Sequence, residues 1–188
     1  MSARPSTRWL IWNVVSVNLG WFGCVLSAAH GQPWLGPALI AVLVAIHLTR
    51  VDARRRESLT LVSAAAVGYA LDSALVLAGA FDFPPAAVVG APTTVWMVAL
   101  WVNFATAING ALYWLGGRPW LAAALGLIGG PMAYYGGVRL GALLLPHGSG
   151  YMLALVALEW LVATPLLIAG AARIGRRVAQ PVSAEVTA

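Results

Sequence analysis

The sequence predicts an all-α fold, a polytopic bundle of six transmembrane helices with both termini in the cytoplasm. Apolar residues make up 61% of the 188 residues and charged residues 9%, whereas globular domains carry about 25% charged residues. Six apolar runs are separated by turn-forming or charged residues. When the runs are laid alternately across a membrane, ten of the eleven arginines fall on one side, which is the bias of cytoplasmic loops.

The first two apolar runs predict a pair of antiparallel spans. The first covers residues 9–29 and ends at a turn formed by residues 30–33. A cleaved signal peptide is the alternative interpretation, because a positive start precedes the run and small residues close it. Its length and the interruptions by Asn13 and Asn18 favour an uncleaved span. The second run, residues 35–50, is short for a membrane span.

Four further runs complete the predicted bundle, and glycines or prolines mark most of their ends. A charged loop, residues 50–58, precedes the third run. The fifth run is interrupted at Pro131, where a kink is expected because proline removes a backbone donor and clashes with the preceding turn. The four runs cover residues 59–81, 93–115, 120–145 and 151–172.

The positions of the arginines orient the bundle. Short arginine-rich loops stay in the cytoplasm, so the loops at residues 30–34, 82–92 and 146–150 are predicted to lie outside. The predicted parts of the chain are a cytoplasmic N-terminus (1–8), a six-helix domain (9–172) and a disordered cytoplasmic tail (173–188). The cytoplasmic arginines are Arg4, Arg8, Arg50, Arg54, Arg55, Arg56, Arg118, Arg173, Arg176 and Arg177.

Three ionisable side chains lie inside the predicted spans, where each costs about 2.5–3.5 kcal/mol unless it is paired, hydrated or functional. Asp72 lies near the middle of the third span, Arg139 in the outer third of the fifth and Glu159 in the outer half of the sixth. Two interpretations stay open. Arg139 forms an ion pair with Glu159 or Asp72, or all three line a polar cavity in which Asp72 or Glu159 is a catalytic acid or base.

Other polar and aromatic residues are candidates for binding a substrate in such a cavity, although hydrogen bonding between helices would equally explain the asparagines. The interrupted fifth span points to a cavity, because a broken membrane helix must turn its freed backbone groups toward protein or water. Close packing through its glycines is the alternative. The candidates are Tyr69, Ser73, Trp101, Asn103, Asn109, Tyr134, Tyr135, Arg139 and His47.

The arginine cluster beside His47, residues 54–56, has two interpretations. It contacts anionic lipid headgroups, as basic loops at the cytoplasmic surface do, or it holds a phosphate-bearing substrate next to His47. A nucleic-acid partner is not predicted, because the arginines border apolar runs instead of sharing one face with polar and aromatic residues. Membrane lipids are the expected partners.

Several reaction classes are excluded by what the sequence lacks. The three histidines lack partners three or four residues away, which excludes a histidine-box di-iron site, and no zinc-protease, nucleophile-elbow or phosphate-loop motif occurs. A retinal Schiff base is impossible because there is no lysine. No metal and no cofactor is predicted.

A set of aromatic, glycine and polar residues along the chain forms a recognisable pattern. Its members are Trp12, Asn13, Gly20, Trp21, Phe22, His47, Glu57, Gly68, Tyr69, Asp72, Ser73, Trp96, Met97, Leu100, Trp101, Phe104, Asn109, Gly130, Pro131, Tyr134 and Gly136. In this pattern the sequence resembles a bacterial family catalogued as domain of unknown function 2878, over about residues 9–172. The resemblance implies a bacterial inner-membrane protein without an established activity, associated with fatty-acid modification. It implies no catalytic residue.

Two functions are expected from these observations. The first is a membrane-embedded enzyme or accessory factor acting on a lipid or another apolar substrate, with Asp72 or Glu159 as the acid–base group. The second is a small transporter or a structural scaffold that uses the same intramembrane polar residues. The sequence does not decide whether the protein is an enzyme.

Overall fold

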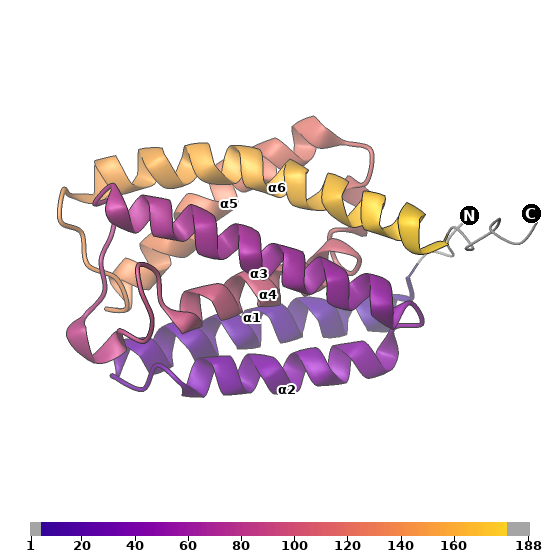
Figure 1. Cartoon of the computed structure of the whole chain (residues 1–188), viewed down its shortest axis with the longest axis horizontal. Helices are drawn as coiled ribbons and strands as arrows, with labels where there is room; N and C mark the ends of the chain where they lie inside the picture. The colour runs from indigo at the N-terminus through magenta and orange to yellow at the C-terminus, as the bar shows by residue number, and fades with distance from the viewer. Residues whose placement is uncertain (1–4, 180–188) are drawn as a thin grey trace, which may run out of the picture.

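The computed structural model describes residues 5–179, and this part of the chain is helical apart from its connections (Figure 1). The prediction of an all-α fold is confirmed. The predicted disorder of residues 180–188 lies outside the described residues. The helices of the described part are α1 (Thr7–Ala29), α2 (Leu35–Arg50), α3 (Arg54–Leu77), η1 (Pro85–Ala87), α4 (Val95–Ile108), η2 (Tyr113–Leu115), α5 (Pro119–Arg139) and α6 (Ser149–Ala179).

The first two helices begin and end close to their predicted limits. The Ser6 hydroxyl caps α1 by accepting a hydrogen bond from the Trp9 N–H at 3.3 Å, which satisfies one of the unpaired donors of the first turn. The chain leaves α1 through Gly31, whose φ of 69° suits glycine. α2 then runs antiparallel to α1 and packs against it.

The third and fourth helices differ from the prediction. α3 begins at Arg54 and not at residue 59, because arginine and glutamate favour helix. α4 ends at Ile108 and not at residue 115, because Asn13 of α1 stops it. The Oδ1 atom of Asn13 accepts a hydrogen bond from the Ala111 N–H at 2.8 Å, and a Cβ atom on Gly110 would overlap the same amide.

The last two helices also correct the prediction. α5 continues through Pro131, so the predicted interruption does not break the helix. It ends at Arg139 and not at residue 145, because the chain turns at Gly141, which has a φ of 86°. α6 continues to Ala179, so residues 173–179 are helical and not part of a disordered tail. Arginines in the last turn of α6 favour this extension, since cations stabilise a helix C-terminus.

The helices pack around α4, which contacts α1, α2 and α3. α6 lies between α3 and α5, and Figure 1 shows α5 and α6 along the edge opposite α1 and α2. The core around α4 is built from large aromatic side chains, and Trp96 and Trp101 are almost fully buried. The bundle therefore packs on both sides of one short central helix.

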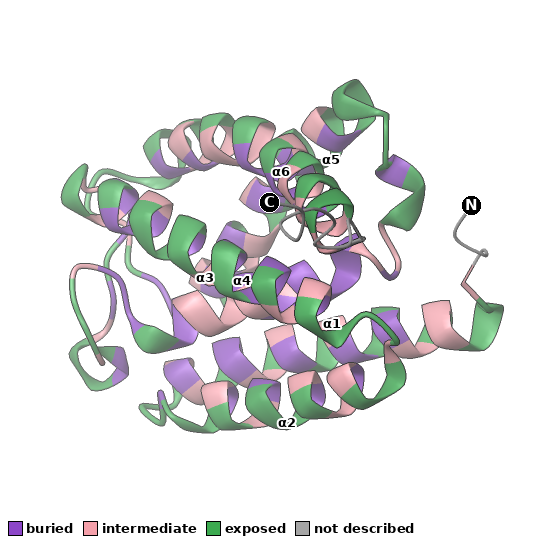
Figure 2. Ribbon diagram, turned by 45° about the vertical axis from the view of Figure 1, so that its right-hand side comes forward, coloured by how far each residue is buried: buried purple, intermediate pink, exposed green. Residues whose placement is uncertain are grey.

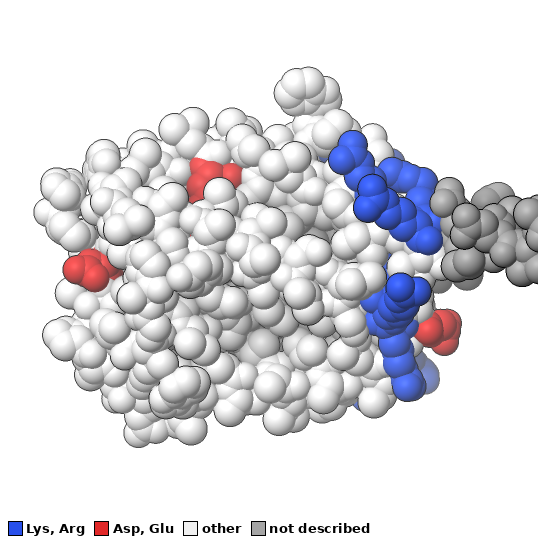
Figure 3. All heavy atoms as spheres, in the orientation of Figure 1, with Lys and Arg blue, Asp and Glu red and all other residues white. Residues whose placement is uncertain are grey.

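The outer surface is apolar along the helices and basic at one end. Trp120, Leu77 and Met132 are 86%, 77% and 69% exposed, and Figure 2 shows exposed positions on the outward faces of the helices. Figure 3 shows the arginines gathered at one end of the molecule. Within residues 5–179, four helices (α1, α3, α5 and α6) are long and apolar enough to cross a membrane, and α2 and α4 are shorter apolar helices.

A buried polar group, here named the Glu57 cluster, joins the helices at the arginine end. Glu57 Oε1 lies 2.8 Å from His47 Nε2, and Glu57 Oε2 accepts a hydrogen bond from Asn109 Nδ2 at 2.9 Å. Asn109 Oδ1 in turn accepts one from Arg56 Nη2 at 2.7 Å. The His47 and Glu57 side chains are each 5% exposed. The cluster therefore connects α2, α3 and the end of α4.

Glu57→Ala is expected to destabilise the protein by about 3 kcal/mol, because it leaves the buried His47 and the half-buried Asn109 side chains without their acceptor. Thermal unfolding of the purified protein in detergent measures the effect. Glu57→Gln keeps an acceptor oxygen, so its loss of stability should be clearly smaller than that of Glu57→Ala. Equal melting temperatures for wild type and Glu57→Ala would show that the cluster does not stabilise the bundle.

Candidate functional site

Asp72 lies in the last third of α3 with none of its surface exposed, and two side chains donate hydrogen bonds to it. Trp101 Nε1 of α4 donates to Asp72 Oδ2 at 2.8 Å, and the Tyr134 hydroxyl of α5 donates to Asp72 Oδ1. A buried carboxyl group needs such partners because water cannot reach it. Three candidates predicted from the sequence are thus brought together from three helices.

The contact between Gly68 and Trp101 places the indole next to Asp72. Gly68 lies one helical turn before Asp72 on α3, so both residues share one face. A Cβ atom on Gly68 would overlap three ring atoms of Trp101. The absence of a side chain therefore lets the indole lie flat on α3, with its Nε1 atom within reach of the carboxylate.

Trp160 of α6 completes the aromatic wall beside Asp72. Its ring stacks on Trp101 with the centroids 4.6 Å apart and the planes at 16°. Its indole also fills the space over Gly130 of α5, where a Cβ atom would overlap it. The sequence analysis did not single out Trp160. The spacing of Gly126 and Gly130 was the available signal, since small residues four apart predict a close helix contact, and the packing of α5 on α6 confirms that contact.

The predicted ion pairs of Arg139 do not form. Within residues 5–179 the ion pair closer than 4 Å is that of His47 and Glu57, and Arg139 is exposed in the last turn of α5. A cation at this position interacts favourably with the helix C-terminus, so it needs no carboxylate. The Glu159 carboxylate oxygens are buried without a hydrogen-bond partner in the described part.

The remaining candidates do not gather around Asp72, except Ser73, which is its neighbour in the chain. Tyr69 and Tyr135 are 45% and 41% exposed, and the Tyr69 hydroxyl donates to the Ala91 carbonyl at 2.9 Å. Asn103 donates to the Val17 carbonyl of α1 at 2.8 Å. His47 and Asn109 belong to the Glu57 cluster. Asn109, which was predicted to face the interior with Asn103, therefore lies at the arginine end with His47 and not at Asp72.

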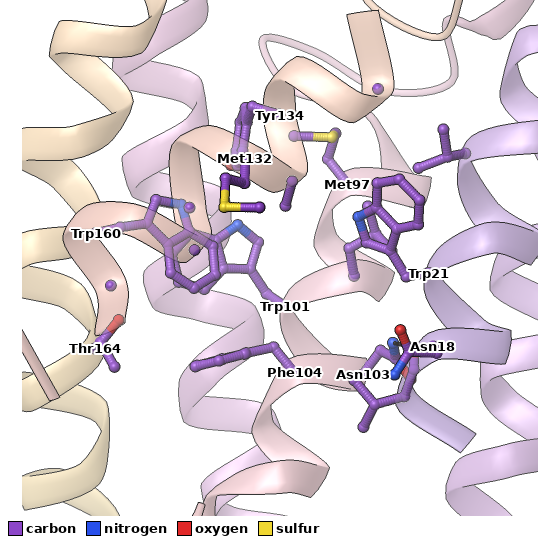
Figure 4. A pocket seen from close by; sticks show the side chains of 18 of the residues that line it. Asn18, Trp21, Met97, Trp101, Asn103, Phe104, Met132, Tyr134, Trp160 and Thr164 are labelled. Carbon is purple, nitrogen blue, oxygen red and sulfur yellow. Dashed lines mark hydrogen bonds between the residues drawn. The ribbon is translucent and has the colours of Figure 1, made fainter. Parts of the chain in front are cut away.

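A pocket of about 430 Å³ lies between α1, α4, α5 and α6 (Figure 4). Trp101 and Tyr134, the two donors to Asp72, are in its wall, and Figure 4 shows Trp21 across the pocket from Trp160. The lining residues are mostly apolar or glycine: Val17, Asn18, Trp21, Val25, Trp96, Met97, Leu100, Trp101, Asn103, Phe104, Leu125, Gly126, Gly129, Gly130, Met132, Ala133, Tyr134, Gly137, Leu143, Trp160 and Thr164.

Two donors in the pocket wall lack a partner within the described chain. They are Trp160 Nε1 and Thr164 Oγ1, both buried. Thr164 is 0% exposed and faces the space left by Gly126, where a Cβ atom would overlap its hydroxyl. Buried donors usually have acceptors, so the wall offers hydrogen bonds to a polar atom within an otherwise apolar pocket.

Comparison with known protein families assigns this chain to one of them. A family model described as a protein of unknown function (DUF2878) matches residues 10–166. The chain belongs to the DUF2878 family. The DUF2878 region contains Asp72, every pocket-lining residue and the whole Glu57 cluster, and it ends before Arg173. The resemblance noted in the sequence is confirmed. No curated protein and no solved structure matches this DUF2878 chain.

Proposed function

We propose that this DUF2878 protein binds the apolar chain of a lipid in the pocket and acts in lipid or fatty-acid modification, as a membrane-embedded enzyme or an accessory factor. The observation that carries the proposal is the position of Tyr134, whose side chain is in the wall of an apolar pocket and whose hydroxyl donates a hydrogen bond to the buried Asp72. A volume of about 430 Å³ lies within the range of small-molecule sites, about 300–1,000 Å³.

The proposed protein lies in a bacterial inner membrane with six spans and both termini in the cytoplasm. The basic end of the bundle supports this orientation, because arginine-rich loops remain cytoplasmic. The start of α1 at Thr7 and the end of α6 at Ala179 lie at the end where the arginines gather (Figures 1 and 3). In this proposal the shorter helices α2 and α4 also cross the membrane, and the connections next to them make up the remaining thickness. The apolar outer surface supports contact with lipid chains.

The proposed chemistry uses Tyr134 as the group that touches the lipid. Its proton can pass to Asp72 Oδ1 while the phenolic oxygen takes a proton from one atom of the lipid. Tyr134 then gives a proton to a different atom of the lipid and takes the proton back from Asp72, so the lipid is isomerised, both groups are restored and Asp72 is the acid–base residue acting through Tyr134. Trp160 and Thr164 would hold an oxygen atom of the ligand with their unpartnered donors. Glu159, the second predicted carboxylate, is next to Trp160 in the chain, has two buried oxygens without a partner in the described residues, and would be a further proton acceptor.

Filling the pocket tests the binding step. Gly129 is in the pocket wall, and a Cβ atom there would meet nothing within 4 Å, so Gly129→Leu should fold while its side chain occupies the ligand space. Gly170→Leu is the matched control, because Gly170 is also helical with open space around it and is not in the wall. We expect lipid bound per protein to fall about tenfold in Gly129→Leu, and mass spectrometry of the purified protein measures it.

The same experiment separates the proposed function from a transporter or scaffold. A scaffold needs no lipid in the pocket, so equal lipid content in wild type, Gly129→Leu and Gly170→Leu would refute the proposal. A transporter would release its cargo across the membrane without changing it, and the profile of cellular lipids would then be unaltered. A modified lipid that is found with wild type and Gly170→Leu but not with Gly129→Leu supports a role in lipid modification.

A further inference from the structure

A second pocket of about 540 Å³ lies at the arginine end, far along the helices from the Asp72 site. It is formed by the connection between α2 and α3, together with one residue near the end of α6. The lining residues are Thr49, Arg50, Val51, Asp52, Ala53, Arg54, Arg55, Arg56 and Val178. This arginine pocket thus brings four guanidinium groups and one carboxylate around one hollow.

The positive charge of the arginine pocket is not neutralised by the described residues. Between residues 5 and 179, no carboxylate lies within 4 Å of any of the four guanidinium groups. Asp52 is in the pocket wall but forms none of these pairs. Like charges held close together repel one another, so the arrangement favours the entry of an anion.

Two of the arginines are held in place, and two are free to turn toward a ligand. The Arg50 guanidinium lies 4.5 Å from the centre of the Trp12 ring, and Arg56 Nη2 donates to Asn109 Oδ1 at 2.7 Å. Arg54 and Arg55 are exposed. Fixed and adjustable guanidinium groups around one hollow suit an anion with several oxygen atoms, because each guanidinium can donate two parallel hydrogen bonds.

The local backbone strengthens the preference for an anion at this pocket. Arg54, Arg55 and Arg56 form the first turn of α3, where the helix dipole already produces a positive potential. Residue 53 at the N-cap is alanine, which offers no side-chain acceptor to the first-turn N–H groups. A bound anion would offset both the charge repulsion and the missing cap.

We infer that the arginine pocket binds a phosphate group, carried by a membrane lipid or by a soluble phosphate compound. A basic loop alone would indicate only orientation in the membrane. The concave wall, the two anchored arginines and the absence, among the described residues, of a carboxylate paired with these arginines distinguish this pocket from such a loop. His47 does not line the pocket, so in this inference the phosphate is held by the arginines and not beside His47.

Binding to the purified protein in an uncharged detergent tests the inference. Dihexanoyl phosphatidic acid and inorganic phosphate are titrated separately at about 0.15 M salt, which screens diffuse attraction, and thermal unfolding gives the dissociation constant. Arg54→Gln/Arg55→Gln removes two charges from the pocket wall. Arg118→Gln/Arg173→Gln removes the same charge outside the pocket wall. We expect binding to weaken about tenfold or more in the first variant and less than about threefold in the second.

The outcomes separate the two sources of phosphate. Tight binding of the lipid alone assigns the site to a headgroup, whereas equally tight binding of inorganic phosphate assigns it to a soluble compound. Equal weakening in both double variants, or no binding of either probe to wild type, would overturn the inference. If Arg54→Gln/Arg55→Gln cannot be purified, Arg54→Gln is compared with Arg118→Gln. This result is independent of whether the Asp72 site binds a lipid chain.

Discussion

Asp72→Asn is expected to abolish the proposed lipid modification while leaving the amount of protein in the membrane close to that of wild type. Asparagine has the size of aspartate and keeps one acceptor oxygen for Trp101 or Tyr134. It cannot accept a proton from Tyr134, and loss of a general acid or base slows a reaction by about 10²–10⁴-fold. Comparative lipid profiling of cells that lack the gene, complemented with wild type or variant, measures the loss.

Two further variants show whether the loss is chemical or structural. Asp72→Leu removes both acceptors from the buried Trp101 and Tyr134, so it should destabilise the protein by about 3 kcal/mol or more and lower its abundance. Tyr69→Phe changes an exposed side chain on the same helix and should leave the lipids unchanged. If cells complemented with Asp72→Asn have the same lipids as cells complemented with wild type, Asp72 is not an acid–base group.

Gly68→Ala is expected to cost about 3–5 kcal/mol of stability, although alanine normally stabilises a helix relative to glycine. The new Cβ atom would overlap the Trp101 ring, so the indole must move from α3. It would lose its hydrogen bond to Asp72 and its stack on Trp160. Overpacking costs about 1–3 kcal/mol and a hydrogen bond to a charged group about 1.5–3 kcal/mol.

The control for Gly68→Ala is Gly170→Ala, a helical position with open space around the glycine. It should melt at the wild-type temperature or slightly above, because only the helix propensity changes. Unfolding in detergent, followed by tryptophan fluorescence, compares the two variants. Similar melting temperatures would mean that the contact between Gly68 and Trp101 does not position the indole.

The number of helices was predictable from the sequence, but several helix ends were not. The limits of α1 and α2 follow from turn residues and charges next to them in the chain, which any local analysis can find. The end of α4 depends on Asn13, which binds Ala111 from another helix. Asn109 and Gly110 follow Ile108 and are a local turn signal, but the apolar residues from 111 to 115 hid this stop from an analysis of hydrophobicity alone. Hydrophobicity marks where a span leaves the membrane but not where its helix ends, because charged residues also form helix. The helical extension of α6 over residues 173–179 was therefore not predictable from the loss of apolar residues.

Asp72 and its two hydrogen-bond donors were predictable as candidates, whereas their pairing and the stacking of Trp160 on Trp101 were not. A polar residue inside a membrane span is conspicuous in any sequence, so Asp72, Trp101 and Tyr134 were all candidates. Depth in the membrane is the only coordinate that counting residues provides. It made Arg139 a plausible partner for Asp72, but pairing also depends on the rotation of each helix about its axis. That rotation is set by the packing of glycines against tryptophans.

The attachment of α5 joins one wall of the pocket to Asp72. α5 packs mainly against α6 and carries much of the pocket wall. Tyr134 lies on α5, while its acceptor Asp72 lies on α3. A ligand wide enough to displace α5 away from α3 would therefore lengthen the hydrogen bond between these two side chains. The width of a bound ligand and the hydrogen bonding of the carboxylate are thereby linked through a single helix.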